Sequence, residues 1–181
     1  AAEFAVLGLG GAFYYQWPMV RGVVESARLV AAHSRGVADQ LSREWPDRPI
    51  THIALGEGPV HFDVGAARRQ FRAAHGLSDD AIVFGLHGSL TEEKRVSEVL
   101  RAFAATLPWV PGARLLLVGA ADPMLGLRNQ LTMLQLTGAV CHVASADDTA
   151  FDQAIAASDV TLNLRWPSAL ETSGPWVRSL A

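Results

Sequence analysis

Between residues 81 and 164, short apolar runs alternate with amphipathic stretches, and this alternation restricts the folds open to the chain. The apolar runs cover 81–86, 113–118, 139–143 and 159–164. The stretch 94–107 places its apolar side chains at the three- and four-residue spacing of one helix face. Unbroken apolar strands are typical of parallel sheets that are covered on both sides. The sequence therefore predicts an α/β fold, a Rossmann-like parallel sheet with helices on both faces.

The part of the chain before this region predicts a smaller unit of the same kind. Helical spacing near 20–27 is followed by a buried strand at 28–32, a helix at 35–45 that Ser34 caps, and a strand at 50–55. The run Gly-Glu-Gly-Pro at 56–59 then interrupts the pattern. We therefore place a domain boundary between residues 57 and 58, with one part at 1–57 and a second at 58–181 that opens on a helix at 66–75.

Composition excludes several classes of protein. Half of the 181 residues are apolar and 18% are charged, so the chain is not intrinsically disordered. The net charge of −3 argues against a protein that coats nucleic acid. The single cysteine, Cys141, excludes a disulfide framework and a cysteine-based zinc site. No apolar run is long enough to predict a membrane span. The chain begins with Ala1 and ends within a predicted helix, so we expect a fragment of a longer protein.

The first candidate site follows the strand predicted at 81–86. Gly88 lets the backbone turn tightly and approach a ligand closely. The predicted helix start at Lys94 offers unpaired N–H groups, and Lys94 and Arg95 add two cations, a combination that suits phosphate. Glu92 and Glu93 are equally consistent with an ordinary solvated first turn, so the residues by themselves leave both interpretations open.

The second candidate site is the segment 167–174, Pro-Ser-Ala-Leu-Glu-Thr-Ser-Gly. Glu171 lies beyond a predicted strand, where its carboxylate can accept hydrogen bonds from sugar hydroxyls. The small residues Thr172, Ser173 and Gly174 can expose backbone N–H groups to phosphate. The alternative is a helix cap made by Thr172 or Ser173, with Glu171 in solvent.

The order and spacing of these motifs resemble those of the group 1 glycosyltransferases, a family of retaining enzymes with the GT-B fold. The family shows a glycine, a gap of five residues and a lysine, matched here by Gly88 and Lys94. It also shows Pro-Ser-x-x-Glu-x-x-Gly, matched by 167–174, after a strand motif matched by Ala-Ser-Asp-Val at 157–160. Leu-Leu-Leu-Val-Gly at 115–119 fits the intervening strand and glycine. The resemblance covers residues 28–181, about five-sixths of the chain.

The resemblance implies that 58–181 is a donor-binding domain, a truncated half of a GT-B architecture. Residues 1–57 would be the remnant of the acceptor-side domain and its linker. The implied reaction transfers a hexosyl group from a nucleoside diphosphate-sugar to a hydroxyl acceptor with retention. The implied catalytic residues are Lys94 and Glu171. Lys94 would neutralise the diphosphate, and Glu171 would contact the sugar. The fragment by itself is expected to be inactive.

Further roles follow from the same resemblance. The implied donor- and phosphate-binding residues are Gly88, Ser89, Lys94, Arg95, Thr172, Ser173 and Gly174, and the base would lie near Val143, Ala144 and Ser145. The nucleotide-sugar is a co-substrate, so no cofactor and no metal are expected. The implied partners are a UDP- or GDP-type donor and a saccharide or lipid-linked acceptor, without nucleic acid. The implied location is cytoplasmic, with contact at the cytosolic membrane face left open.

Two positions depart from the family pattern. Ser89 stands where many members carry arginine directly after the motif glycine, and Ser179 stands where many carry a second glutamate. These replacements favour an alternative, a degenerate glycosyltransferase-like domain that binds without catalysis. A nucleotide-sugar 2-epimerase shares the architecture and also stays open. The glycine-containing run at 8–12 raises a third alternative, a dinucleotide-binding domain.

Overall fold

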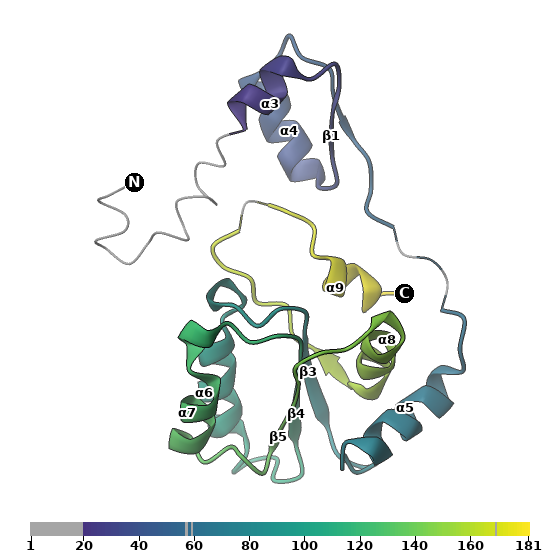
Figure 1. The fold of residues 1–181 in the computed structure, drawn as a ribbon, viewed down its shortest axis with the longest axis vertical. Coiled ribbons are helices and arrows are strands. Elements are labelled where there is room, and N and C mark those ends of the chain that lie inside the picture. The colour runs from purple at the N-terminus through teal and green to yellow at the C-terminus, as the bar shows by residue number, and fades with distance from the viewer. Residues whose placement is uncertain (1–19, 57, 59, 169) are drawn as a thin grey trace. The chain divides into compact units, whose positions relative to one another are not determined.

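The computed structural model describes residues 20–56, 58, 60–168 and 170–181, and the chain divides into two compact units (Figure 1). The first unit takes the chain before residue 58 together with Pro167–Val177, and the second takes Gly58–Trp166 with Arg178–Ala181. Pro167–Val177 thus groups with the first unit although it follows the second in sequence. The assignment of 1–57 and 58–181 to acceptor-side and donor-binding domains stays a prediction. The run at 8–12 lies outside the described residues.

The first unit is a small βαβ arrangement preceded by a helix. Its elements are α3 (Arg21–Ser26), β1 (Val30–Ala32), α4 (Arg35–Glu44) and β2 (Ile50–His52). β1 and β2 pair in parallel, and the Ser34 hydroxyl accepts from the amide of Val37, which confirms the predicted cap. The strand predicted to be buried at 28–32 is shorter and half-exposed, because the described part of this sheet has only two strands for α4 to cover.

The second unit contains most of the regular structure. Its elements are α5 (Val64–Ala74), β3 (Val83–His87), the 3₁₀ turn η1 (Glu92–Lys94), α6 (Val96–Thr106), β4 (Arg114–Val118), η2 (Pro123–Leu125), α7 (Leu127–Met133), β5 (Val140–Val143), α8 (Asp148–Ala157) and β6 (Val160–Thr161). A last helix, α9 (Gly174–Arg178), ends where the chain returns to this unit. There, Arg178 forms ion pairs with Asp148 and Asp152 of α8.

The four strands of the second unit form a parallel sheet in the order β5-β4-β3-β6, with helices on both faces (Figure 1). Successive residues of β4 face opposite sides, so Leu115 and Leu117 pack with α6 and α7. Leu116 and Val118 pack on the other face with α5 and α8. β3 and β4 are almost wholly buried, as expected for strands covered on both faces. The predicted α/β fold class is therefore confirmed.

Two predicted elements of the second unit also differ from the structure. The helix predicted at 94–107 begins only at Val96, because Arg95 adopts a left-handed conformation (φ 60°) between η1 and α6. The amide of Trp166 donates to the carbonyl of Glu93 over 2.7 Å, which takes an acceptor that a continuous helix would use. The strand predicted at 159–164 is shorter in the structure, because its pairing with β3 ends where the amide of Leu162 donates to the carbonyl of Gly85.

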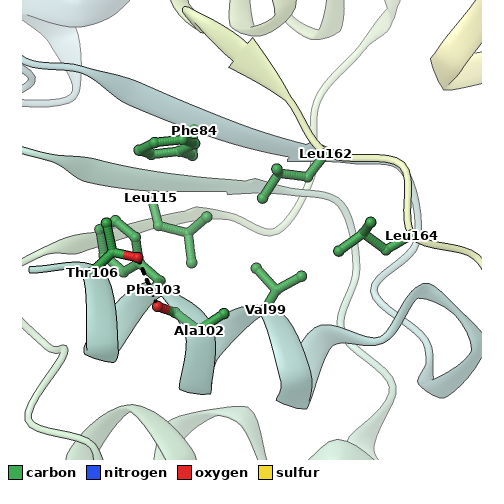
Figure 2. A pocket seen from close by; sticks show the side chains of 8 residues that line it. All are labelled: Phe84, Val99, Ala102, Phe103, Thr106, Leu115, Leu162 and Leu164. Carbon is green, nitrogen blue, oxygen red and sulfur yellow. Dashed lines mark hydrogen bonds between the residues drawn. The ribbon is translucent and has the colours of Figure 1, made fainter.

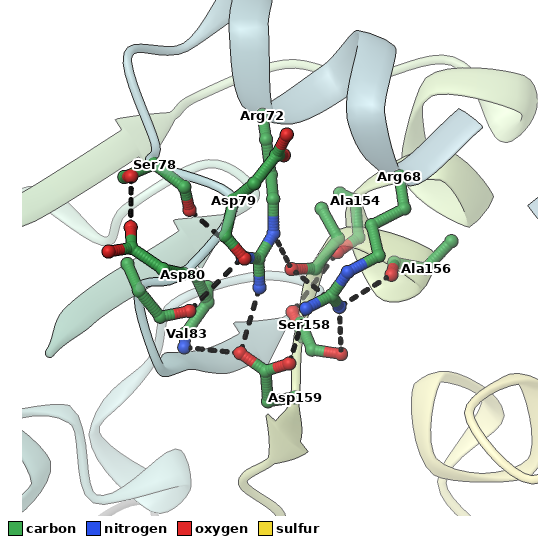
Figure 3. Close-up of polar contacts among 12 residues, drawn as sticks. Arg68, Arg72, Ser78, Asp79, Asp80, Val83, Ala154, Ala156, Ser158 and Asp159 are labelled. Atoms are coloured by element: carbon green, nitrogen blue, oxygen red, sulfur yellow. Dashed lines mark hydrogen bonds and ion pairs between the residues drawn. The ribbon is translucent and has the colours of Figure 1, made fainter. Parts of the chain in front are cut away.

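A fully buried arginine joins four elements at the amino end of this sheet (Figure 3). The guanidinium of Arg72, on α5, donates to the carbonyls of Ser78, Asp79 and Ala81, each within 3.1 Å, and to that of Ala157 at 3.0 Å. It also pairs with Asp159 over 2.8 Å. Since one side chain satisfies this many acceptors, it fixes the ends of α5 and α8 against the starts of β3 and β6.

Asp159 is the acidic partner in this network. Its carboxylate accepts from the amide of Val83 at 2.7 Å and pairs with Arg68 as well as with Arg72. Burial alone would raise the pKa of Asp159, but the Val83 amide and the two arginines hold that pKa below its ordinary value. The acid of the motif at 157–160 therefore has a structural role, far along the strands from their carboxyl ends.

Candidate functional site

The carboxyl ends of the four parallel strands meet at one edge of the sheet. β4 and β5 lie on one side of β3, and β6 lies on the other, so the strand order reverses between β3 and β6. In open α/β sheets, ligands bind outside the carboxyl ends of the strands at such a switch point. The segments that follow β3 and β6 are therefore where a ligand site is expected in this unit.

The loop after β3 is held against the loop after β4 by backbone contacts. The amide of Leu90 donates to the carbonyl of Ala120 at 2.8 Å, and the amide of Asp122 donates to the carbonyl of Leu90 at 2.9 Å. Gly88 and Gly119 both have positive φ, of 84° and 133°. A Cβ on Gly119 would lie only 2.5 Å from the carbonyl oxygen of Gly88. The absence of a Cβ at Gly119 therefore allows the peptide of Gly88 to pack closely against it.

Replacing Gly119 with alanine is expected to lower the free energy of unfolding by at least about 2 kcal/mol, because the backbone conformation is strained for alanine and the new methyl group meets backbone atoms. Urea denaturation of the variant measures this change. Gly112→Ala is the matched control, since a Cβ there meets nothing within 4 Å. A Gly119→Ala variant as stable as Gly112→Ala would contradict the assigned close approach.

Lys94 ends the turn η1 and is only 8% exposed. Its Nζ donates to the carbonyl oxygen of His87, the last residue of β3, over 2.6 Å. An ammonium group carries three donors, so this bond fixes its position and occupies one of them. Burial lowers the pKa of Lys94 to about 8, with a further contribution from the positive charge of Arg165, while Glu93 acts in the opposite direction. The structure thus provides a partly desolvated cation beside the end of β3.

The ring of His87 points away from the loop that follows it. The side chain is 5% exposed and packs edge-on against Phe151 of α8 at 5.9 Å. Its Nε2 lies 3.4 Å from the hydroxyl of Ser158. Burial lowers the pKa of His87 to about 4, and the charge of Lys94 adds to that effect, so the ring is neutral at pH 7. His87 serves the site through its carbonyl group rather than its imidazole.

Two arginines flank the same turn. The guanidinium of Arg95 lies 5.7 Å from the ring centroid of Trp166, and it forms a 3.1 Å ion pair with Glu98. Arg165 immediately precedes Trp166, whose amide holds the carbonyl of Glu93. Ser89, the predicted phosphate ligand next to Gly88, is exposed. The turn carrying Lys94 therefore lies between the loop after β3 and the segment after β6.

The segment around Glu171 belongs to the first unit. The hydroxyl of Ser168 donates to Glu171 Oε2 and accepts from the amide of Leu170, both at 3.0 Å, and Leu170 has a positive φ of 63°. The Thr172 hydroxyl donates to the carbonyl of His33 at 3.0 Å. The following helix, α9, begins at Gly174 directly after Ser173. Lys94 and Glu171 thus belong to different units, and their joint action stays a prediction.

The residues predicted near a nucleotide base follow the edge strand β5. The carbonyl of Val143 accepts from the amide of Gly119 at 2.8 Å, which links this strand end to the glycine beside Gly88. Ala144 and Ser145 are exposed directly after the strand. Their position at the carboxyl edge of the sheet agrees with a ligand-facing loop, while a contact to a base stays a prediction.

Two hollows lie elsewhere on the second unit. One, of about 160 Å³, is lined by residues of α6, β3, β4 and the segment after β6: Phe84, Val99, Ala102, Phe103, Thr106, Leu115, Leu162 and Leu164 (Figure 2). Its only hydroxyl, on Thr106, donates to the carbonyl of Ala102. The other, of about 410 Å³, lies beside α7 and β5 and includes Arg128 and His142. Neither hollow is lined by a residue of the predicted donor site.

Within the described part of the chain, no three histidine, cysteine, aspartate or glutamate side chains are grouped so that they could hold a metal ion. The same residues include no helix that is both long and apolar enough to cross a membrane.

No protein-family model matches the chain, and no curated protein matches it in sequence. Solved structures do share its fold. HepE of Anabaena, in complex with UDP and glucose, is 23% identical with a TM-score of 0.60 over 79% of this chain and 39% of HepE. WaaG, a glycosyltransferase involved in lipopolysaccharide biosynthesis, is 16% identical with a TM-score of 0.68 over 83% of this chain and 41% of WaaG.

A third similar structure is itself a single domain. The C-terminal domain of a group 1 family glycosyl transferase, LpcC from Francisella tularensis, is 17% identical with a TM-score of 0.54 over 68% of this chain and 62% of that domain. The chain therefore has the fold of glycosyltransferase structures of the GT-B type, as its motifs predicted. It spans about two fifths of HepE and of WaaG.

Proposed function

We propose that this chain contains the donor-binding part of a group 1 glycosyltransferase, which transfers a sugar from a nucleoside diphosphate-sugar to a hydroxyl acceptor with retention. The observation that carries the proposal is the position of Gly88 and Lys94 directly after β3, at the switch point of a sheet with a glycosyltransferase fold. The complex of the similar HepE with UDP and glucose supports a nucleotide-sugar as the ligand class.

In the proposed mechanism, Lys94 stabilises the charge that grows on the departing diphosphate. The hydrogen bond to the His87 carbonyl holds the ammonium in place before the donor arrives. Burial strengthens the interaction of this cation with an anion, because little water screens it. The loop at Gly88 and Ser89, in which Gly88 is half-buried and Ser89 is exposed, brings backbone amides to the phosphates. This arrangement assists departure of the leaving group through fixed cations and amides, and needs no metal ion for that task.

The remaining roles follow the family pattern. Glu171 accepts hydrogen bonds from hydroxyls of the donor sugar, and the amides of Thr172, Ser173 and Gly174 contact phosphate or sugar. The bond from Ser168 to Glu171 keeps that carboxylate oriented. The loop at 143–145 lies near the base. The acceptor in this proposal is a saccharide or a lipid-linked saccharide, and the reaction takes place in the cytoplasm.

Affinity for a nucleoside diphosphate is expected to fall as the pH rises through about 8. The unbound Lys94 loses its proton near this pKa, under the charges of Arg165 and Glu93 and beside the neutral ring of His87, so above pH 8 binding must restore that proton. The loss then approaches about tenfold per pH unit. The pKa of Lys94 in the folded protein lies below its ordinary value of 10.5. Between pH 8 and 10.5 the unfolded chain therefore binds more protons than the folded protein, so this group raises the free energy of unfolding as the pH rises. A loss of affinity in this range is therefore not caused by unfolding through Lys94.

Fluorescence titration of the full-length protein with UDP, ADP and GDP between pH 7 and 9.5 checks this dependence. The phosphates titrate near pH 6 and are constant over that range. Lys94→Met is expected to bind more weakly and to lack the alkaline loss. The same alkaline loss in wild type and Lys94→Met would assign it to another group.

A binding domain without catalysis is the second candidate function, favoured by Ser89 and Ser179. In the structure, Ser179 accepts a 3.5 Å hydrogen bond from the hydroxyl of Thr161 on β6. A panel of UDP-, ADP- and GDP-sugars, incubated with the full-length protein and mixed saccharide acceptors, separates the possibilities by mass spectrometry. Sugar transfer that Glu171→Gln abolishes supports the proposed enzyme. Donor binding without transfer supports the binding domain, and an epimerised donor sugar supports the 2-epimerase.

A further inference from the structure

The motif after β3 supplies few cations for a diphosphate. Lys94 is one, but the position directly after the motif glycine carries Ser89, where arginine is common in the family that the chain resembles. A diphosphate has several charged oxygens, and planar guanidinium groups bind such oxygens in pairs. A second cation beside Lys94 would therefore bind a diphosphate more tightly than Lys94 alone.

Arg95 is the nearest cation in sequence, but its guanidinium is already directed elsewhere. It lies over the ring of Trp166 and forms an ion pair with Glu98 on α6. The left-handed backbone at Arg95 sends the chain directly into α6. Arg95 therefore braces Trp166, and with it the segment that follows β6.

Arg165 lies in that braced segment. β6 is the strand next to β3 on the far side of the switch point, so residues after β6 approach the loop after β3. The bond from the Trp166 amide to the Glu93 carbonyl, at 2.7 Å, fixes this approach beside the turn that ends in Lys94. Arg165 is half-buried, and its charge is among the causes of the lowered pKa of Lys94. The two cations are thus within electrostatic reach of each other.

A diphosphate carries enough negative charge to interact with two neighbouring cations at once. We infer that Arg165 binds the diphosphate of the donor together with Lys94, and that it takes the place of the arginine that Ser89 replaces. The inference rests on the proposed function and adds a ligand from a different strand end. Arg165 contacts the phosphate oxygens through its guanidinium, so it selects diphosphates over nucleosides.

Calorimetric titration of the full-length protein with UDP, ADP, GDP and inorganic pyrophosphate tests this role. Arg165→Gln is expected to weaken binding of pyrophosphate and of the preferred nucleoside diphosphate by about 10-fold or more, and Arg165→Lys by less. Affinity for the parent nucleoside and the unfolding temperature are expected to stay at wild-type values. Arg101→Gln, an exposed substitution on α6, is the matched control and is expected to bind like wild type.

The outcomes separate this inference from the proposed function. If Lys94→Met weakens diphosphate binding but Arg165→Gln does not, Arg165 is no ligand and the proposed function stands. If Arg165→Gln weakens nucleoside binding equally, or lowers the unfolding temperature markedly, its role is structural and the inference is overturned. If the wild-type protein binds none of the probes, the proposed function itself fails, and this inference fails with it.

Discussion

Replacing Arg72 with methionine is expected to lower the free energy of unfolding by about 3–5 kcal/mol, the largest stability effect that the structure indicates for a single substitution. The guanidinium is fully buried and satisfies four backbone carbonyls as well as Asp159. Methionine fills much of the same volume but leaves those acceptors without their donor. The cost therefore arises mainly from the unpaired backbone carbonyls and only slightly from lost packing, since Asp159 keeps its ion pair with Arg68 and its hydrogen bond from the Val83 amide.

Urea denaturation of wild type and Arg72→Met measures this cost. Arg69→Met is the matched control, because Arg69 is exposed on the same helix, and it is expected to change the free energy of unfolding by less than about 0.5 kcal/mol. A loss below about 1 kcal/mol in Arg72→Met would show that the network around Asp159 contributes little to stability.

The layered architecture could be predicted from the sequence because its signals are local. The unbroken apolar runs of β3 and β4 are typical of strands that are buried on both faces. The spacing of apolar residues between these runs predicts an amphipathic helix that can cover one of those faces. Ser34 could be identified as a cap from its position directly before a helix. Each of these signals lies within a few residues of the element that it specifies.

The network of Arg72 could not be predicted in the same way. In the sequence, Arg72 falls in a predicted helix with other arginines and looks like part of a solvated face. Its acceptors at Ala157 and Asp159 are 85 and 87 residues away, and three others are backbone carbonyls that carry no sequence signal. The available hint was an acid directly before a strand, at Asp159, together with two arginines four positions apart on one helix.

The candidate site was predicted in part. The spacing of Gly88 and Lys94 identified the loop after β3, and the structure places Lys94 beside the end of that strand. The left-handed break at Arg95 was missed because it depends on Trp166, about seventy residues further along the chain. Arg165 was missed for the same reason. Thr172 and His33 are even further apart in the sequence, so no local pattern predicts the hydrogen bond between them.

Replacing Lys94 with methionine is expected to weaken nucleoside diphosphate binding by about 10- to 150-fold, the largest functional effect for a single substitution in the second unit. This range corresponds to the about 1.5–3 kcal/mol of a hydrogen bond to a charged group. Methionine keeps the buried aliphatic volume of the lysine stem, so the fold is expected to remain intact. Circular dichroism checks the fold, and calorimetric titration measures the affinity.

Affinity for the parent nucleoside is the internal control for this variant, because a nucleoside carries no phosphate for Lys94 to bind. It is expected to be the same in wild type and Lys94→Met. Equal loss for nucleoside and nucleoside diphosphate would indicate a displaced loop rather than a missing cation, and no loss for either would remove Lys94 from the site.

Calorimetric titration of the wild-type full-length protein with UDP, ADP and GDP, each paired with its nucleoside, measures how much the phosphates contribute to binding. At least one nucleoside diphosphate is expected to bind at least about tenfold more tightly than its nucleoside, because a buried cation meets the phosphates. Nucleosides that bind as tightly as their diphosphates, or no binding by any of the six compounds, would contradict this expectation.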